Sequence, residues 1–316
     1  MLALATRVLS PPGARARLST FIFHRVLRTP DPLLPDEPDA AAFDAMLGWI
    51  GSQFQVLDPL EACERLAAGA LPARAAAITF DDGYRDNHDV ALPLLDKHGM
   101  KAAFFIATGF TGGGAMFNDR VIEAVRACRA DRLDVSGIGL GVHGLHDDGQ
   151  RRAAVGSLLT AVKHLEPTRR ARAVDGLVQA AGADAPVDLM MGEAQLRQLA
   201  ARGMRVGGHT RTHPILRVLD DASAQREIAG GRDDLLAITG EAPRLFAYPN
   251  GRLGDDFEAR HADFVRDAGF GFAFTTHGGV SDIATPPYLL RRFTPWDRTR
   301  TRFGARSLVN LARRAA

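Results

Sequence analysis

Two short stretches of the chain carry side chains that could do chemistry together. Residues 79–83 read Thr-Phe-Asp-Asp-Gly, and residues 209–214 read His-Thr-Arg-Thr-His-Pro. A carboxylate can act as a general base, and two histidines four positions apart can converge on one metal ion. Two imidazoles and one carboxylate with open coordination positions form a hydrolytic metal site. The two stretches together therefore predict metal-dependent hydrolysis.

Each stretch on its own has an ordinary explanation. Asp-Asp-Gly is also typical of a plain turn, and an isolated histidine pair on a surface usually has no function. Both stretches, however, directly follow a predicted strand, at 75–80 and at 204–208. Active sites of β/α folds lie at the carboxyl ends of strands. The shared placement favours a catalytic site over two unrelated turns.

A third stretch, residues 244–251, reads Arg-Leu-Phe-Ala-Tyr-Pro-Asn-Gly and ends a predicted strand on the same edge. A Pro-Asn-Gly turn can aim backbone N–H groups at a developing oxyanion. The same tripeptide is common in turns without function.

The strands and helices that must position these residues are predicted from the hydrophobic period, which switches between 2 residues for strands and 3.6 residues for helices. Strands are predicted at 20–26, 54–57, 75–80, 102–107, 204–208, 244–248, 271–275 and 288–292. Helices are predicted at 39–53, 58–69, 88–98, 119–129, 151–165, 168–181, 193–202, 221–239 and 256–268. This alternation indicates an α/β fold, a closed or nearly closed β/α barrel, with a doubly wound open sheet as the alternative.

The regular rhythm breaks between about 109 and 192, which predicts a mainly helical insertion. The insertion divides one domain at 20–297, preceded by an arm at 1–19 and followed by a basic tail at 298–316. The order of charged and apolar residues in the arm does not fit a signal peptide. Cys63 and Cys128 lie in no disulfide or metal framework, so we expect reduced core residues in a cytoplasmic protein.

Composition excludes several classes of protein. The chain has 316 residues with a formal net charge of +2, which predicts no nucleic-acid partner. No apolar run approaches the ~18 residues of a membrane span. The tail carries several arginines around Leu308, Val309 and Leu311, so it could lie on an anionic membrane as an amphipathic helix. A solvated terminal helix is the alternative.

Together the stretches resemble the polysaccharide deacetylases of the NodB homology type, carbohydrate esterase family 4. Thr79–Gly83 matches the first family motif and His209–Pro214 the second. The resemblance implies a distorted β/α barrel in which Asp82, His209 and His213 ligate one divalent metal ion, usually Zn²⁺. It also implies that Asp81 is the general base.

The remaining family motifs are altered. The usual Arg-Pro-Pro-Tyr-Gly is replaced by Ala247–Gly251, as in a subgroup with a Phe-Ala-Tyr-Pro stretch, and the oxyanion N–H would come from Asn250. Tyr248 and Pro249 of this stretch are candidate substrate contacts. The fourth motif is not found. The fifth motif usually supplies a histidine as general acid, but residues 288–292 read Tyr-Leu-Leu-Arg-Arg.

The arginine that normally orients the base is Ala247 here. We expect Arg25 to take its place, with Arg292 as second candidate, because a fixed cation keeps a carboxylate base ionised. Arg25 in a structural ion pair at the barrel rim is the alternative. In that case His24 becomes the better candidate for a site contact, with substrate or as the missing proton donor.

Several other polar and aromatic residues are weaker candidates. Trp296 could stack on a sugar ring or pack after the last strand, and Asn118 and Asp119 could contact substrate at the site mouth. His277 could be the missing acid, although a surface loop histidine fits better. His143, His146, Asp147 and Asp148 fit a solvated loop better than a metal site.

The expected activity is hydrolysis of a carbon–nitrogen bond that is not a peptide bond. The substrate is an N-acetylated amino sugar of a bacterial polysaccharide or of its lipid-linked precursor, and the products are acetate and a free amine. A non-sugar amidase and a non-catalytic carbohydrate-binding relic of the fold are the alternatives. A glycolipid substrate and a membrane-bound tail would place the protein at the inner membrane.

Overall fold

The computed structural model describes residues 2–184 and 188–312, which fall into two compact units. The larger unit consists of the described residues up to Thr29, of Asp36–Gly109, and of the described residues from Met191 onward. The smaller unit consists of Pro30–Pro35 and the described part of Phe110–Met190.

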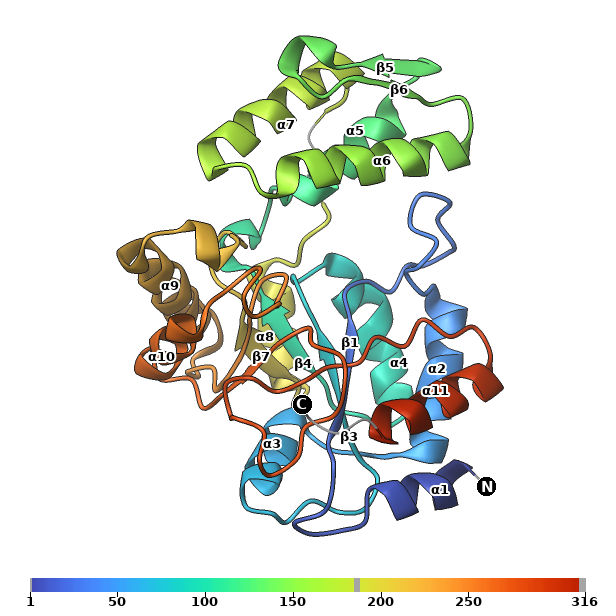
Figure 1. The fold of residues 1–316 in the computed structure, drawn as a ribbon, viewed down its shortest axis with the longest axis vertical. Coiled ribbons are helices and arrows are strands. Elements are labelled where there is room, and N and C mark those ends of the chain that lie inside the picture. The colour runs from blue at the N-terminus through green and yellow to red at the C-terminus, as the bar shows by residue number, and fades with distance from the viewer. Residues whose placement is uncertain (1, 185–187, 313–316) are drawn as a thin grey trace. The chain divides into compact units, whose positions relative to one another are not determined.

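A curled parallel sheet forms the centre of the larger unit (Figure 1). The strand order is β1-β3-β4-β7-β8-β9, and the short β2 pairs with the start of β3. The strands are β1 (Ser19–Phe23), β2 (Gln55–Val56), β3 (Ala75–Phe80), β4 (Ala103–Ile106), β7 (Arg205–Gly208), β8 (Leu245–Ala247) and β9 (Phe272–Phe274). Each of these pairs is parallel, so the carboxyl ends of all the strands lie at one edge.

The sheet is nearly closed by a segment that belongs to no regular strand. Leu290 bridges to Phe274 of β9, and Phe293 bridges to Phe21 of β1, both in parallel. The predicted strand at 288–292 is therefore reduced to single bridges, but it links the two edges of the sheet. The predicted distorted β/α barrel is confirmed, and the open doubly wound sheet is not.

Helices of the larger unit begin where the sequence offers capping groups. Asp39, Asp58 and Asp220 each accept a hydrogen bond from a backbone N–H in the first turn of the following helix. The α-helices are α1 (Leu2–Leu9), α2 (Ala40–Gln53), α3 (Pro59–Ala67), α4 (Leu92–Lys97), α8 (Glu193–Ala201), α9 (Asp221–Thr239), α10 (Ala259–Asp267) and α11 (Arg300–Ala312). A π-helical turn (Asn87–Ala91) precedes α4, and short 3₁₀ turns lie at Thr108–Phe110 and Leu216–Val218.

The two faces of the sheet are buried in different cores, which explains why β3 is apolar throughout. Ala76, Ile78 and Phe80 of β3 point into a core shared with α2, α4, α8 and α11. Figure 1 shows α2, α4 and α11 on this side of the sheet. Ala75 and Ala77 point to the inner face with Phe105 and Phe274. Because side chains alternate along a strand, Thr79 and Asp81 continue on the inner face.

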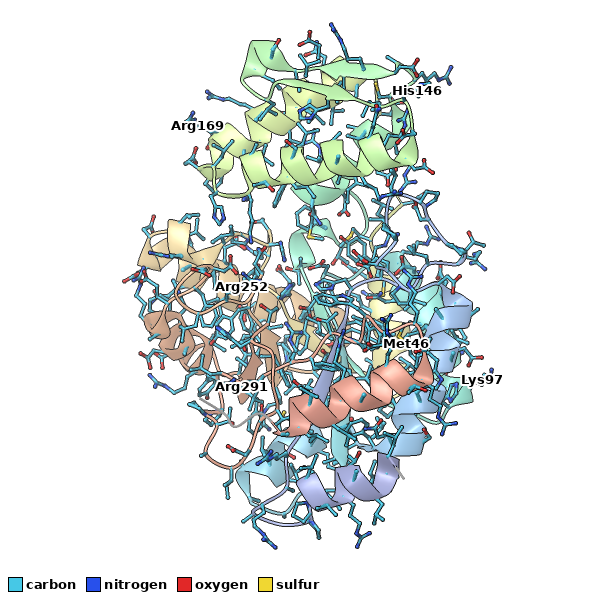
Figure 2. The ribbon with its side chains drawn as sticks, turned by 45° about the vertical axis from the view of Figure 1, so that its right-hand side comes forward. Met46, Lys97, His146, Arg169, Arg252 and Arg291 are labelled. Carbon is cyan, nitrogen blue, oxygen red and sulfur yellow. The ribbon has the colours of Figure 1, made fainter. Side chains whose placement is uncertain are left out.

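The smaller unit is mainly helical. It contains α5 (Phe117–Ala127), α6 (Asp148–Lys163) and α7 (Pro167–Ala181), with a 3₁₀ turn (Ser136–Ile138) and the antiparallel pair β5 (Arg132–Asp134) and β6 (Val142–Gly144). These elements share one apolar core that includes Val121, Leu158 and Leu177. Pro30–Pro35 joins this unit through an Arg126–Asp31 ion pair of 2.6 Å, which the sequence did not predict. Figure 2 shows His146 and Arg169 on its surface.

The terminal segments pack on the larger unit. The arm contains α1, and the close approach of Leu2 to Gly304 brings α1 against α11. Phe303 and Leu311 of α11 are buried, whereas Val309 is exposed. Arg313 and Arg314 of the predicted tail lie outside the described residues. Within residues 2–184 and 188–312, no helix has both the length and the apolar character needed to cross a bilayer. Cys63 and Cys128 are free and buried.

Candidate active site

Asp81 and Asp82 lie in a tight turn at the carboxyl end of β3. The Asp81 N–H donates to the Phe23 carbonyl of β1 (3.0 Å). Asp82 (φ 78°) and Gly83 (φ 91°) then adopt left-handed backbone conformations, which reverse the chain. Asp81 and Asp82 are only 2% and 5% exposed. Burial of two adjacent carboxyl groups is costly unless each has a partner, and both do.

His209 directly follows β7, and its N–H donates to the Ile106 carbonyl of β4 (3.1 Å). β7 and β3 flank β4 in the sheet, so the two loops face each other across one strand. The Thr210 hydroxyl donates to the His209 carbonyl (2.5 Å) and accepts from the His213 N–H (3.1 Å). This side chain therefore links the backbones of the two histidines.

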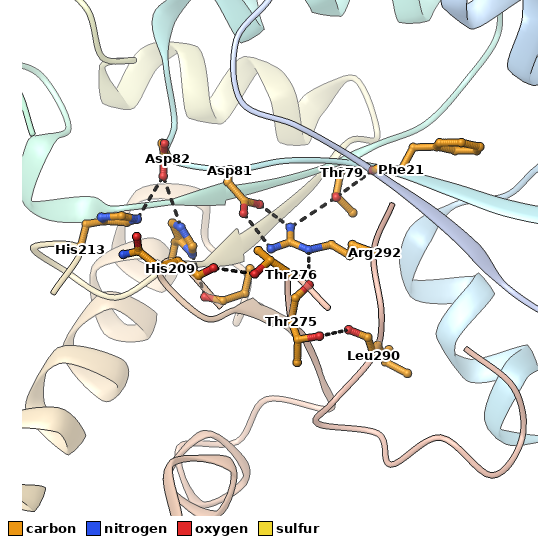
Figure 3. Close-up of polar contacts among 12 residues, drawn as sticks. Phe21, Thr79, Asp81, Asp82, His209, His213, Thr275, Thr276, Leu290 and Arg292 are labelled. Atoms are coloured by element: carbon orange, nitrogen blue, oxygen red, sulfur yellow. Dashed lines mark hydrogen bonds and ion pairs between the residues drawn. The ribbon is translucent and has the colours of Figure 1, made fainter. Parts of the chain in front are cut away.

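The Asp82, His209 and His213 side chains converge on one point (Figure 3). The Nε2 atoms of both rings lie 3.3 Å from Oδ1 of Asp82. Candidate ligand atoms of the three residues all lie within 4.8 Å of one another. Within the described residues, this is the group of three whose geometry suits a metal ion.

The protonation states at this point fit a cation. His209 Nδ1–H donates to the Ala247 carbonyl (2.7 Å), so in the neutral ring Nε2 carries the lone pair. Burial lowers the pKa of His209, but the Asp82 and Asp81 carboxylates outweigh burial and raise it, so a metal ion would compete with a proton for Nε2. Burial lowers the pKa of His213 to about 4, which leaves a neutral imidazole at pH 7. Burial raises the pKa of Asp82, but His213 and His209 outweigh burial and hold it well below its usual value. Two lone pairs and a carboxylate facing one another suit a divalent ion between them.

Arg292 holds Asp81 in a doubly hydrogen-bonded ion pair. Its two terminal nitrogens donate to the two carboxylate oxygens at 2.6 and 2.8 Å, and Nε donates to the Thr275 carbonyl (2.8 Å). Burial raises the pKa of Asp81, but Arg292 outweighs burial and keeps the pKa below its usual value. Asp81 is thus an oriented, ionised carboxylate beside the three candidate ligands, which suits a general base.

The expectation that Arg25 would be the partner of Asp81 is wrong. Arg25 Nε donates to Asp86 (2.8 Å), and its guanidinium lies over the Tyr84 ring. β1 ends at Phe23, and the following chain is held by Asp86, which also accepts from the Val26 N–H. Arg292, the second candidate, is the partner of Asp81. Its segment closes the barrel, and its side chain points to the inner face.

His24 lies beside Asp81 at the end of β1. Phe23 and Phe80 are paired in register, so the next residues, His24 and Asp81, are neighbours on the inner face. Asn87 Nδ2–H donates to the His24 carbonyl (2.8 Å). After the effects of burial, Arg292 and His209, a charge on His24 lowers the pKa of Asp81 further. His24 is half-buried, and its role as a site contact or proton donor stays a prediction.

Asn250 forms the apex of the third loop with a left-handed backbone (φ 59°). Its carbonyl accepts from the Thr276 hydroxyl (2.6 Å), and the Gly251 N–H donates to the Pro249 carbonyl (2.7 Å). Within the described residues, no hydrogen bond is made by the Asn250 N–H. The sequence reasoning missed the anchors Thr275 and Thr276, whose signal was a Thr-Thr pair after a strand.

Tyr248 does not face substrate, which corrects its predicted role. The side chain is fully buried and stacks on Phe257, with ring centroids 3.8 Å apart. Strand alternation turns Phe246 and Tyr248 to the outer side, whereas Ala247 belongs to the inner core. Pro249 is also buried, so it offers no open surface to a sugar.

The other predicted residues lie in varied surroundings. Trp296 is 65% exposed just beyond the closing segment, with the Arg306 guanidinium 5.7 Å from its ring centroid. Asn118 and Asp119 lie in the first turn of α5 in the smaller unit, and their role as substrate contacts stays a prediction. His277 lines a cavity of about 560 Å³ in the larger unit.

The histidines and aspartates of the insertion have local roles. His143 contacts the Leu140 carbonyl (2.8 Å), and His146 is exposed. Asp147 caps α6 by accepting from the Gln150 N–H, and Asp148 begins this helix. These contacts agree with the loop interpretation.

Comparison with known proteins decides the family. A family description of polysaccharide deacetylases matches residues 68–270. The chain belongs to the polysaccharide deacetylase family. This match contains the Asp81–Asp82 turn, both histidines and the Asn250 loop. The Phe-Ala-Tyr-Pro subgroup stays a prediction.

One relative matches a short stretch of this chain. YxkH of Bacillus subtilis (strain 168), named as a proposed polysaccharide deacetylase, is 42% identical over 66 residues. That match covers 20% of the chain and 24% of YxkH, so it spans about a quarter of the relative's length.

Two solved structures are similar in fold. The deacetylase PplD of Streptococcus pyogenes, in complex with acetate, has a TM-score of 0.57 at 18% identity, covering 88% of this chain and 92% of PplD. IcaB of Ammonifex degensii has a TM-score of 0.58 at 19% identity, covering 93% and 98%.

Proposed function

We propose that this deacetylase hydrolyses N-acetyl groups from amino sugars of a bacterial polysaccharide or its lipid-linked precursor, in a metal-dependent reaction. One observation carries the proposal. A buried carboxylate base, paired with Arg292, lies beside three residues whose donor atoms suit one divalent ion. A base next to a Lewis-acid site is the combination that metal-dependent amide hydrolysis uses.

Asp82, His209 and His213 would hold the ion, and two imidazoles with one carboxylate favour Zn²⁺. When bound, such an ion polarises a carbonyl group and lowers the pKa of water. In the reaction, water adds to the acetamide carbonyl carbon, the carbon–nitrogen bond breaks, and acetate and an amine are released.

The protein's own residues have distinct roles in this proposal. Asp81 accepts a proton from the attacking water, and Arg292 keeps its carboxylate ionised and oriented. The Asn250 N–H donates to the oxyanion of the tetrahedral intermediate; one such donor is worth about 3–4 kcal/mol. His24, on the same face as Asp81, donates a proton to the leaving nitrogen.

The exposed Trp296 could hold the glycan. The closing segment runs parallel to β1, so residues after Phe293 lie at the carboxyl edge with His24. An exposed indole at this edge can stack on the apolar face of a sugar ring. The Arg306 guanidinium lies over the same ring, 5.7 Å from its centroid.

A cytoplasmic location and contact with the inner membrane belong to this proposal as well. Only Val309 of the three apolar tail residues is strongly exposed, which leaves a small apolar surface on α11. Co-sedimentation of the full chain and of a Val309→Ser variant with anionic vesicles tests this part, because deletion of α11 would remove Phe303 and Leu311 from the core. Equal pelleting of the two chains contradicts the membrane contact.

The decisive experiment combines metal analysis with acetate release. The purified protein is incubated with N-acetylated chitooligosaccharides and with lipid-linked N-acetylamino sugars. One equivalent of metal and release of acetate support the proposal. Bound metal without acetate from any sugar, but with hydrolysis of other amides, indicates a non-sugar amidase. Absence of both metal and turnover indicates a non-catalytic protein.

A further inference from the structure

One face of α9 is built around the loop that carries both histidines. Three residues follow Glu227 at 3, 4 and 7 positions and so share one face of the helix with it: Gly230, Gly231 and Asp234. Each of the four contacts or closely approaches residues 209–213. None of them belongs to the family motifs discussed above.

Glu227 binds the loop backbone directly. One carboxylate oxygen accepts from the N–H groups of Arg211 (2.9 Å) and Thr212 (2.8 Å), and the other accepts from the Thr212 hydroxyl (2.8 Å). A single side chain thus fixes two successive peptide units between the two histidines.

Asp234 fixes the same loop from the next turn of the helix. It accepts from Nε and a terminal nitrogen of Arg211, at 2.8 and 2.6 Å. It also accepts from the Thr108 hydroxyl (2.7 Å). Thr108 follows β4, whose end also binds the His209 N–H, so Asp234 ties the histidine loop to the sheet.

Gly231 allows the loop backbone to touch the helix. A Cβ atom on Gly231 would lie 2.9 Å from the Thr210 carbonyl oxygen and 3.0 Å from its carbonyl carbon. A Cβ atom on Gly230 would meet the Arg211 side chain instead, at 2.8 Å from Nε. The first contact is with the Thr210 backbone, next to His209. The second is with the Arg211 side chain, which Asp234 also binds.

The loop needs such support. Thr210 (φ 64°) and His213 (φ 53°) both have left-handed backbones, which are unfavourable for non-glycine residues and especially for β-branched Thr. Conformations of this kind persist only where the surrounding structure enforces them.

We propose that Glu227, Gly231 and Asp234 are positioning residues that hold His209 and His213 in metal-binding geometry. This inference rests on the proposed function, since it assumes that Asp82 and the two histidines bind a metal ion. It adds that ligand geometry is set by a helix that supplies no ligand.

The test compares Gly231→Ala with Gly156→Ala, a control in α6 where an added Cβ atom would meet no heavy atom within 4 Å. Both substitutions favour a helix, since Ala is the better helix former. The Zn²⁺ affinity of each variant is measured by chelator competition, and the visible spectrum of the Co²⁺ form reports ligand geometry. Gly231→Ala should weaken Zn²⁺ binding about 10–100-fold, the usual effect of losing an outer-shell contact. Gly156→Ala should bind Zn²⁺ close to the wild-type level.

Glu227 supplies a second, independent variant. Glu227→Ala should weaken Zn²⁺ binding and alter the Co²⁺ spectrum, while Glu227→Gln, which retains a carbonyl acceptor, should restore much of the affinity. Far-UV circular dichroism and melting of the metal-free variants show that each is folded. A folded Gly231→Ala and a folded Glu227→Ala with wild-type affinity and spectra would overturn the proposal.

Failure of the underlying function has a different signature. If the wild type binds no Zn²⁺, or if His213→Asn still binds one equivalent, the metal site itself is wrong and this inference falls with it. Normal binding by the wild type with unaffected helix variants overturns only the role of α9.

Discussion

Arg292 and Asp81 are 211 positions apart in the chain, yet they form a doubly hydrogen-bonded ion pair at 2.6 and 2.8 Å. Their side chains are 0% and 3% exposed. Such a pair cannot be broken on one side without leaving a buried charge. The ion pair joins the segment that closes the barrel to Asp81, the candidate general base.

Arg292→Ala should lower the free energy of unfolding and shift the pH dependence of kcat/KM. Removing one partner of a buried pair costs about 3–5 kcal/mol of unfolding free energy. Arg292 lowers the pKa of Asp81, so its loss should raise that pKa. The acidic limb of kcat/KM should therefore move to higher pH, because the base must be ionised. Arg292→Lys keeps the positive charge and should shift the acidic limb of kcat/KM less. If the limb does not move in either variant, Arg292 does not set the pKa of Asp81.

Asp81→Asn should keep the metal and lose turnover by about 10²–10⁴-fold, the usual contribution of a general base. Metal content and kcat are measured on the same preparation. Asp82→Asn is the matched variant, one residue away and equally buried, and it should lose the metal. Loss of metal from Asp81→Asn would instead make Asp81 a ligand.

His213→Asn should abolish stoichiometric metal binding. Asn is chosen because it tolerates the left-handed backbone of this position better than Ala does. Added Zn²⁺ should raise the melting temperature of the wild type, since binding to the folded state stabilises it, but not that of the variant. Full zinc occupancy in the variant would show that His213 is not a metal ligand.

Trp296→Ala should raise KM for oligosaccharides with little change in kcat. Aromatic stacking contributes about 0.5–1.5 kcal/mol, which corresponds to a two- to tenfold change in KM. The indole is 65% exposed, so the melting temperature should stay near that of the wild type. An unchanged KM for every chain length tested would make Trp296 a surface residue without a role in binding.

His261 should make stability depend on pH independently of the metal site. It is fully buried in α10, where Nδ1 accepts from the Glu258 N–H. Burial, followed by the charge of Arg260, lowers the pKa of His261 to about 4. The unfolded chain takes up a proton below about pH 6.5, so stability falls as pH drops from 6.5 to 4. The loss is at most about 3 kcal/mol.

The variant His261→Gln isolates this effect. Gln at this position can accept the same Glu258 N–H as part of a capping box. Its unfolding free energy, measured by urea denaturation, should vary less between pH 6.5 and 4 than that of the wild type. Above pH 7 the two curves should run parallel. Equal slopes at low pH would show that His261 is not held neutral in the fold.

The local part of this protein could be predicted from its sequence. The buried strand was predicted from the apolar run at 75–80 alone, and the pairing of His209 with His213 from their spacing. Both are properties of short segments of the chain. The barrel followed from the alternation of such segments, and the ends of parallel strands necessarily share one edge.

Tertiary structure decided the partners that come from distant segments. Arg292 rather than Arg25 meets Asp81, because the end of β1 and the register of the closing segment determine which guanidinium points inward. Tyr248 turns away from the site because strand alternation directs it into the outer core. The contacts of Glu227 and Asp234 with the histidine loop depend on how α9 packs. Packing of segments far apart in the chain is a collective property, which no local pattern of residues encodes.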